Sequence, residues 1–415
     1  MTMQTCHKKS SIKGKLFSLV VFKYKRDTLV HRSNFKTELR SVLRKLQGRR
    51  RIMETTEANE RPKILGGCMK TRNVQALAAD HNLLTADILE KYIRPEMAVD
   101  DVLLENNSEE IPVIDMSRLM DEVSREEEAS KLKCACEDWG FFQLVNHGVP
   151  EKVIEELKED LMRFYDLPLE KREEVAQLPG DLEGYGQAFI ASEEQKLDWA
   201  DMLYLFTQPP HFRNYKHWPS QPPSFRGSLE NYSNATQEVA HCIMGFMATI
   251  LGIKRETISE IHGSQTVRIN YYPPCANGHD KMIGLSPHSD GCGLTLLLQV
   301  NPVSGLQIRR NGKWLPIVPL PGALIVNIGD ALEILTNGRY KSIEHRAVIN
   351  AKEERISIAA LHSPSFEKTV GPLAEIVGKG TPLFKSVTMP EYVKLFVSQK
   401  KIYGKKMVEL LKLNP

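Results

Sequence analysis

The tripeptide His288-Ser289-Asp290 sets an imidazole and a carboxylate two positions apart, within the run of residues 282–300. Residues i and i+2 of a β-strand point to the same face, so both side chains can approach one point in space. They would supply two of the three ligands in the two-histidine, one-carboxylate set that binds non-haem Fe(II) and leaves coordination positions open. A single His-x-Asp pair occurs often by chance, so the prediction of an iron site depends on a third ligand.

His345 is the candidate for that ligand, because it follows the strand-like run 323–330 and we expect it on another strand of the same small barrel. Ten residues later, Arg355 and Ser357 form a further i, i+2 pair on one strand face. Arginine offers a planar fork that matches a carboxylate, and the serine hydroxyl adds a second donor. The pair therefore predicts a carboxylate-binding position near the metal site.

A strand upstream of these residues begins near Thr266 and ends in the sequence NYYPPC, residues 270–275. The same period-2 argument places Arg268, Asn270 and Tyr272 on one face of that strand. If these strands close into a barrel, all of the side chains named so far point into one cavity.

Four motifs, NYYPPC, HSD, SIEHR and RIS, stand in the order and spacing of the plant Fe(II)/2-oxoglutarate-dependent dioxygenases of the isopenicillin N synthase-like superfamily. The chain resembles this family from about Glu60 to its C-terminus. The segments EEQKLDWADM and GLQIRRNGKW are similar to the branch of codeine demethylase-like and norcoclaurine synthase-like proteins. One departure is Gly291-Cys292-Gly293, where relatives usually carry a less glycine-rich turn, and which we expect to loosen the substrate side of the site.

The resemblance implies a mixed α/β protein with a double-stranded β-helix (jelly-roll) core, about residues 265–364, flanked by helices. It assigns His288, Asp290 and His345 to Fe(II). It assigns Arg355, Ser357 and Tyr272 to the distal carboxylate of 2-oxoglutarate, with Asn270 near the other end. The family's chemistry also implies O2, ascorbate as reductant, and release of succinate and CO2 while a substrate C–H bond undergoes hydroxylation, O-demethylation or desaturation.

The substrate-facing wall can be extended from the same pattern. Beyond the Arg-x-Ser pair, period 2 predicts that Ala359, Leu361 and Ser363 line the cavity, and the resemblance adds Met202 and Tyr204. This lining is largely apolar, which suits a small aromatic or terpenoid-like molecule better than a sugar or a peptide. We therefore expect a small, largely apolar plant specialised metabolite or hormone as the substrate.

Two alternatives remain open at this point. The first is an aminocyclopropane-carboxylate-oxidase-like enzyme, which uses the same iron set without 2-oxoglutarate. The second is a non-catalytic relative that only binds a small molecule. The long lead before Ile111 argues against the first, and the complete ligand set argues against the second.

Composition limits the class of protein. Apolar residues make up 41% of the 415 residues, and no stretch approaches the roughly 20 apolar residues that span a bilayer. The seven cysteines are scattered and odd in number, which indicates reduced thiols in an intracellular compartment. We expect a cytoplasmic monomer that binds a small molecule, with no nucleic-acid or membrane partner.

The N-terminal region differs in charge from the rest of the chain. Residues 1–51 hold 15 Lys/Arg and two acidic residues, Asp27 and Glu38, whereas the remainder holds 40 basic and 50 acidic residues. Three explanations fit: a transit peptide, a nuclear-localisation or nucleic-acid arm, or non-native sequence from an upstream start codon. We favour the upstream start, with a nuclear or organellar location if the extension is native.

The expected organisation has six parts: a basic extension, disordered or non-native (1–52); an N-terminal arm (53–110); an N-terminal dioxygenase domain (111–225); a long linking helix (226–260); the jelly roll (261–365); and C-terminal helices (366–415). Within them we expect an amphipathic helix over 232–252 and cover helices over 389–413. We also expect a capping box at Ser124 and Glu127, a glycine-containing loop at 183–188, and a backbone-bonded turn histidine, His147.

Overall fold

A computed structural model describes residues 69–94, 110–178, 180–187, 190, 194–276, 279–398 and 407–413. All of them belong to one of the two units into which the chain divides, Pro62–Pro415. The basic extension predicted for 1–52 lies outside the described residues. None of the helices in the described ranges combines the length and the apolar character that a membrane span requires.

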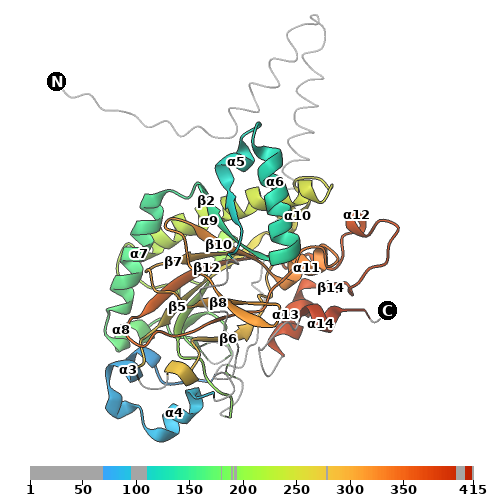
Figure 1. The fold of residues 1–415 in the computed structure, drawn as a ribbon. Coiled ribbons are helices and arrows are strands. Elements are labelled where there is room, and N and C mark those ends of the chain that lie inside the picture. The colour runs from blue at the N-terminus through green and yellow to red at the C-terminus, as the bar shows by residue number, and fades with distance from the viewer. Residues whose placement is uncertain are drawn as a thin grey trace, which may run out of the picture. The chain divides into compact units, whose positions relative to one another are not determined.

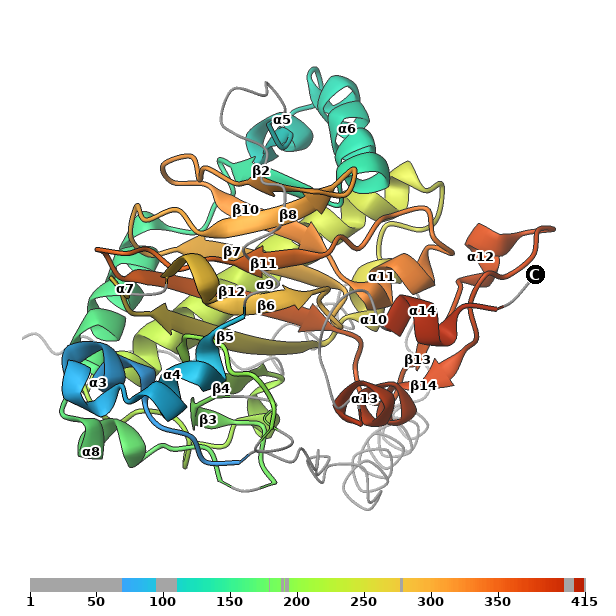
Figure 2. The ribbon, with the colours of Figure 1, turned by 60° about the horizontal axis from the view of Figure 1, so that its bottom comes forward.

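Strands of the described residues form two large sheets and one small one (Figures 1 and 2). The first sheet has the order β1-β2-β10-β7-β12-β5-β4-β3, the second β6-β11-β8-β9, and the third pairs β13 with β14. The strands are β1 (Val113–Asp115), β2 (Phe141–Val145), β3 (Gly184–Gly186), β4 (Asp201–Gln208), β5 (Ser264–Tyr272), β6 (Leu285–His288), β7 (Leu294–Gln299), β8 (Leu306–Arg310), β9 (Lys313–Pro316), β10 (Leu324–Ile328), β11 (His345–Ala347), β12 (Arg355–Ser363), β13 (Thr369–Val370) and β14 (Val387–Thr388). The predicted mixed α/β class with a jelly-roll core is confirmed.

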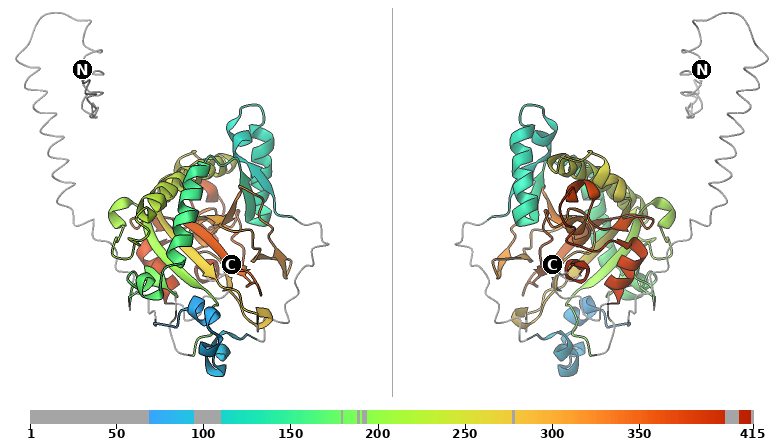
Figure 3. Two further views of the ribbon diagram at one scale, coloured as in Figure 1. Left: turned by 90° about the vertical axis from the view of Figure 1, so that its left-hand side faces the viewer. Right: turned by 90° about the vertical axis from the view of Figure 1, so that its right-hand side faces the viewer.

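Helices flank these sheets, and Figure 3 shows α3 and α4 at one end and α5 and α6 at the other. The α-helices are α3 (Val74–Ala79), α4 (Ala86–Tyr92), α5 (Met116–Met120), α6 (Arg125–Cys134), α7 (Glu151–Tyr165), α8 (Leu169–Glu173), α9 (Phe225–Ile250), α10 (Thr257–Ile261), α11 (Asp330–Leu335), α12 (Ala374–Val377), α13 (Met389–Val397) and α14 (Met407–Leu411). Short 3-10 turns cover His81–Leu83, Pro210–Phe212 and His279–Lys281, and a π-helical turn, Ala135–Trp139, follows α6.

The long helix α9 supports the larger sheet from its outer face. Its buried residues Val239, Ile243 and Met247 recur at helical spacing and belong to the same core as the sheet residues Ile269 and Ile358. The helix begins at Phe225, seven residues before the start of the amphipathic helix predicted over 232–252, because the buried residues Phe225 and Leu229 continue the apolar stripe.

Two local predictions are wrong for identifiable reasons. Ser124 precedes α6, but its hydroxyl donates to Arg118 and Asp121 instead of capping the helix, so no capping box forms with Glu127. The segment predicted as a glycine-containing loop contains β3, which pairs with β4. At Gly184, φ is +118° and a Cβ would lie 2.6 Å from a backbone nitrogen, so glycine permits the strand to pass closely.

Candidate active site

The strand register brings the two candidate histidines together. His288 is the last residue of β6, His345 is the first residue of β11, and the two are direct partners in the antiparallel ladder. Asp290 lies two positions beyond the end of β6, in the turn before β7. The expectation that Asp290 shares the strand with His288 is therefore wrong, although the turn still directs its carboxylate to the histidines.

The geometry of the three side chains suits a metal ion. Oδ1 of Asp290 lies 3.6 Å from Nε2 of His288 and 3.7 Å from Nε2 of His345, and the three ligand atoms all lie within 4.8 Å of one another. Nδ1 of His288 bonds the backbone oxygen of Ser286 at 2.8 Å, and Nδ1 of His345 bonds that of Ile343 at 3.1 Å. Because each Nδ1 donates to a carbonyl, each Nε2 keeps its lone pair for a metal.

The charge states of this group agree with that geometry. Burial alone would raise the pKa of the Asp290 carboxyl, but His345, His288 and a hydrogen bond from Asn327 together hold it below its usual range. Burial, with His288, lowers the pKa of His345 to about 4, so its imidazole is neutral at pH 7. Two imidazoles and one carboxylate are the donor set that non-haem Fe(II) takes on one face, so the residues fit this ion.

Arg355 and Tyr272 form the second part of the site, as partners at the ends of β12 and β5. The guanidinium is 2% exposed and lies 5.2 Å over the Tyr272 ring. Nη2 donates to Gln299 at 3.3 Å and Nη1 lies 3.5 Å from Oγ of Ser357, whereas Nε has no hydrogen-bond partner. No carboxylate of the described residues pairs with Arg355. A buried guanidinium that faces a cavity and has no carboxylate partner is suited to an anionic ligand.

The predicted cavity residues do face one cavity, of about 250 Å³. On β5, Thr266, Arg268, Asn270 and Tyr272 line it, and Nε of Arg268 donates to Oδ1 of Asn270 at 2.7 Å. The alternate residues of β12 and two residues of β4 complete the predicted lining: Ala359, Leu361, Ser363, Met202 and Tyr204.

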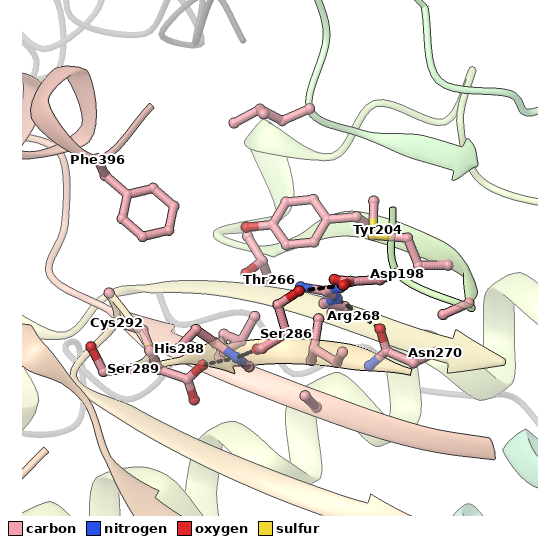
Figure 4. Close-up of a pocket in the computed structure, with 18 of the residues that line it drawn as sticks. Asp198, Tyr204, Thr266, Arg268, Asn270, Ser286, His288, Ser289, Cys292 and Phe396 are labelled. Atoms are coloured by element: carbon pink, nitrogen blue, oxygen red, sulfur yellow. Dashed lines mark hydrogen bonds and ion pairs between the residues drawn. The ribbon is translucent and has the colours of Figure 1, made fainter. Parts of the chain in front are cut away.

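Helix α13 forms a wall of the cavity, whereas the sequence predicted only that helices in this region cover the sheet. Tyr392, Val393 and Phe396 line the cavity, and Figure 4 shows Phe396 and Tyr204 projecting toward it from two sides. An apolar i, i+4 pair, Tyr392 and Phe396, was the available signal. The Phe396 ring fills the space beside Gly291, because a Cβ at this glycine would lie 3.0 Å from the ring.

A polar corner of the cavity was also missed. Oδ1 of Asp198 accepts a hydrogen bond from the Ser286 hydroxyl and pairs with Arg94 at 3.0 Å, and both Asp198 and Ser286 line the cavity (Figure 4). Asp198 lies within EEQKLDWADM, a segment that indicated only the similarity to a family branch. The pairing with Arg94 could not be found there, because it joins distant parts of the chain.

Two other histidines have structural partners. Nε2 of His147 bonds the backbone oxygen of Gly322 at 3.1 Å, which confirms the prediction of a backbone-bonded turn histidine. His362 lies on β12 between the cavity residues Leu361 and Ser363, and its Nε2 is 3.0 Å from Nε2 of Gln265. It points to the opposite face and is no member of the metal cluster.

Comparison with known proteins identifies the family. Residues 111–221 match the family described as non-haem dioxygenase in morphine synthesis N-terminal, and residues 263–364 match the 2OG-Fe(II) oxygenase superfamily. The chain is 48% identical to 2-oxoglutarate-dependent dioxygenase 11 of Oryza sativa subsp. japonica and 47% identical to S-norcoclaurine synthase 1 of Coptis japonica, each over 84% of this chain and 98% of the relative.

Further comparisons agree with this assignment. Codeine O-demethylase of Papaver somniferum is 39% identical over 84% of this chain and 98% of its own length, which supports the branch suggested by the sequence motifs. A crystal structure of JOX2 in complex with 2OG, Fe, and JA has a TM-score of 0.75 and 34% identity, over 83% of this chain and 99% of that chain. The chain therefore belongs to the 2OG-Fe(II) oxygenase superfamily and is an oxidoreductase, a dioxygenase that uses Fe(II) and 2-oxoglutarate.

Proposed function

We propose that the protein oxidises a C–H bond of a small, largely apolar specialised metabolite or hormone, by hydroxylation, O-demethylation or desaturation. In this proposal Fe(II) binds to His288, Asp290 and His345. Four residues bind 2-oxoglutarate: Arg355, Ser357, Tyr272 and Asn270. When bound, Fe(II), 2-oxoglutarate and O2 would supply the oxidising chemistry, with succinate and CO2 as the products of 2-oxoglutarate.

The observation that carries the proposal is the position of Arg355, a buried cation without a carboxylate partner, in the same cavity as the metal cluster. Its guanidinium is buried and meets no carboxylate of the described residues, so it lacks the anion that a buried cation needs. A dicarboxylate that reaches from this guanidinium toward the histidines would supply that anion. Tyr272 and Ser357 lie beside the guanidinium and would orient the same carboxylate.

The substrate class follows from the remaining walls. Met202, Tyr204, Leu361 and Ser363 line the part of the cavity that we assign to the substrate, and Phe396 closes it from α13. Aromatic and aliphatic side chains predominate, which favours an apolar or aromatic molecule. The similarity to codeine O-demethylase makes O-demethylation one of the outcomes to test, beside hydroxylation and desaturation.

A turnover screen tests the proposal. The purified protein, loaded with Fe(II) and ascorbate, is given 2-oxoglutarate, O2 and a library of alkaloids, flavonoids, terpenoids and plant hormones, and succinate release is compared with the rate without substrate. Product mass separates gain of an oxygen atom, loss of a methylene unit and loss of two hydrogen atoms. Turnover that needs no 2-oxoglutarate would favour the oxidase alternative, and tight binding of a library compound without succinate release would favour the binding alternative.

Two expectations from the sequence stay proposals. We propose a monomer, which light scattering on the purified chain tests. We propose a cytoplasmic location, which imaging of the tagged full-length chain tests.

A further inference from the structure

We propose that Thr295 and Asn327 are positioning residues that hold Asp290 so that only one of its carboxylate oxygens is free for the metal. The inference rests on the proposed metal site and concerns residues that contact a metal ligand but not the metal itself. Neither residue lines the cavity, and both are buried, at 3% exposure each. They can therefore act on the metal only through Asp290.

The two oxygens of Asp290 have different surroundings. Oδ2 accepts a hydrogen bond of 2.5 Å from Oγ1 of Thr295 and one of 2.8 Å from Nδ2 of Asn327. Oδ1 faces Nε2 of both histidines, at 3.6 Å and 3.7 Å. One oxygen is thus engaged by two protein donors, while the other points to the place that the metal would take.

The sheet register explains why both donors reach the same atom. Thr295 lies on β7 and Asn327 on β10, and the two are direct partners in this antiparallel pair. Partner residues lie side by side on one sheet face. Their side chains therefore converge on a single carboxylate oxygen at the edge of the metal turn.

A thiol extends this hydrogen-bond chain toward the cavity wall. Sγ of Cys292 lies 3.2 Å from Oγ1 of Thr295. The threonine hydroxyl has one proton, and it donates that proton to Asp290, so the hydroxyl oxygen accepts from the Cys292 thiol. This contact fixes the rotation of the hydroxyl and keeps its proton directed at Oδ2.

The junction between β10 and α11 holds the backbone of the same turn. The amide of Asp330 donates to the carbonyl oxygen of Asp290 at 2.7 Å, and the hydroxyl of Ser289 donates to Oδ2 of Asp330 at 3.0 Å. A Cβ at Gly329 would lie 2.1 Å from the carbonyl oxygen of Cys292, so glycine is required for this close approach. Residues 327–330 thus support the metal turn without supplying a ligand.

The functional consequence concerns the number of open coordination positions. A carboxylate that binds through one oxygen leaves the positions that 2-oxoglutarate and O2 need. If Oδ2 lost its donors, the carboxylate could rotate and engage a metal through both oxygens. We therefore expect loss of the Thr295 donor to weaken Fe(II) binding and to impair chelation of 2-oxoglutarate.

The test compares Thr295→Val, which keeps the shape but removes the donor, with Thr295→Ser, which restores the hydroxyl. Anaerobic titration measures Fe(II) affinity and the visible charge-transfer band that 2-oxoglutarate produces on chelating Fe(II). We expect Thr295→Val to weaken Fe(II) binding about 10–100-fold and to shift or reduce the band, as is typical for residues that orient a metal ligand. Thr295→Ser is expected to restore both values close to those of wild type.

Thr236→Val is the matched control, because Thr236 is also buried, but its hydroxyl donates to the backbone of α9 and accepts from Gln265 and not from a residue of the metal cluster. Thermal unfolding of the metal-free proteins shows whether each variant keeps its fold. A folded Thr295→Val variant with the Fe(II) affinity and the charge-transfer band of wild type would overturn the inference. A Thr295→Ser variant that loses as much Fe(II) affinity and band intensity as Thr295→Val would also overturn it. A wild-type protein that binds no Fe(II) would instead contradict the proposed function.

Discussion

The hydroxyl of Tyr392 in α13 donates a hydrogen bond of 2.8 Å to the backbone oxygen of Gly291, in the turn that carries Asp290. One helical turn later, Phe396 lies against the same glycine, where a Cβ would be 3.0 Å from its ring. Helix α13 and the turn that carries Asp290 are therefore packed together, and α13 forms one wall of the cavity beside the metal cluster.

The first prediction tests this packing with Gly291→Val. The added side chain collides with Phe396, and overpacking of this kind costs about 1–3 kcal/mol. Adding Phe396→Ala removes the obstacle, so the double variant should recover part of the loss in the free energy of unfolding. Urea denaturation of the four proteins in this cycle gives the coupling between the two positions. Strictly additive losses would show that Gly291 and Phe396 do not share this space.

The second prediction concerns the metal ligands. His345→Ala removes one of three ligand atoms and should abolish Fe(II) binding in an anaerobic titration, with little change in the circular dichroism of the folded protein. His362→Gln is the control, because His362 lies on the same barrel but bonds Gln265 on the opposite face of β12. Retained Fe(II) binding in His345→Ala, together with its loss in His362→Gln, would contradict the ligand assignment.

The third prediction is a pH dependence of stability. Burial lowers the pKa of His262 to about 4, against about 6.5 in an unfolded chain, with a smaller lowering by His241. Between these values the unfolded state binds more protons than the folded state, so the free energy of unfolding falls as pH decreases from about 6.5 to about 4. At about 1.4 kcal/mol per pKa unit, the contribution of His262 is on the order of 3 kcal/mol.

His262→Gln should flatten this slope in urea denaturation curves recorded with a chelator present, so that no metal competes for the histidines of the site. His211→Gln is the matched control, because His211 is exposed. Parallel slopes in wild type and His262→Gln would show that the folded protein accommodates a protonated His262.

Part of the candidate metal group could be predicted from the sequence because that information is local. His288, Asp290 and the Arg355–Ser357 pair are recognisable from residue type and short spacing, and hydrophobic periodicity indicated α9 and the β12 face. The resemblance to a known family joined these motifs into one cavity. Even so, strand geometry predicts the wrong element for Asp290, because β6 ends at His288 and a turn supplies the carboxylate.

The missed features depend on contacts between residues far apart in the chain. Nothing near Gly291 indicates that Phe396 fills the space beside it, and nothing near Thr295 indicates that Asn327 is its partner across the sheet. Register and helix docking set these relationships, and neither follows from residue spacing along one segment. The run 323–330 illustrates this point, since its sequence predicts only a strand, whereas its last four residues support the turn that carries Asp290.

The fourth prediction concerns the co-substrate. Loss of a bidentate, charge-assisted contact removes two hydrogen bonds worth about 1.5–3 kcal/mol each. Arg355→Leu should therefore raise the apparent Michaelis constant for 2-oxoglutarate by at least about a hundredfold, at about 1.4 kcal/mol per factor of ten. Ser357→Ala loses one neutral donor and should have a smaller effect, and Fe(II) affinity should change little in either variant.

The metal-free protein offers an independent measurement of the same arrangement. Because Arg355 is buried without a carboxylate partner among the described residues, replacing it with leucine removes a buried charge that no carboxylate neutralises. Without ligands, Arg355→Leu should therefore have a free energy of unfolding equal to or greater than that of wild type. Saturating 2-oxoglutarate with Fe(II), in contrast, should stabilise wild type much more than the variant. Succinate release against 2-oxoglutarate concentration and thermal unfolding with and without ligand give the two readouts. An unchanged Michaelis constant, or equal stabilisation of both proteins by 2-oxoglutarate, would show that the distal carboxylate binds elsewhere.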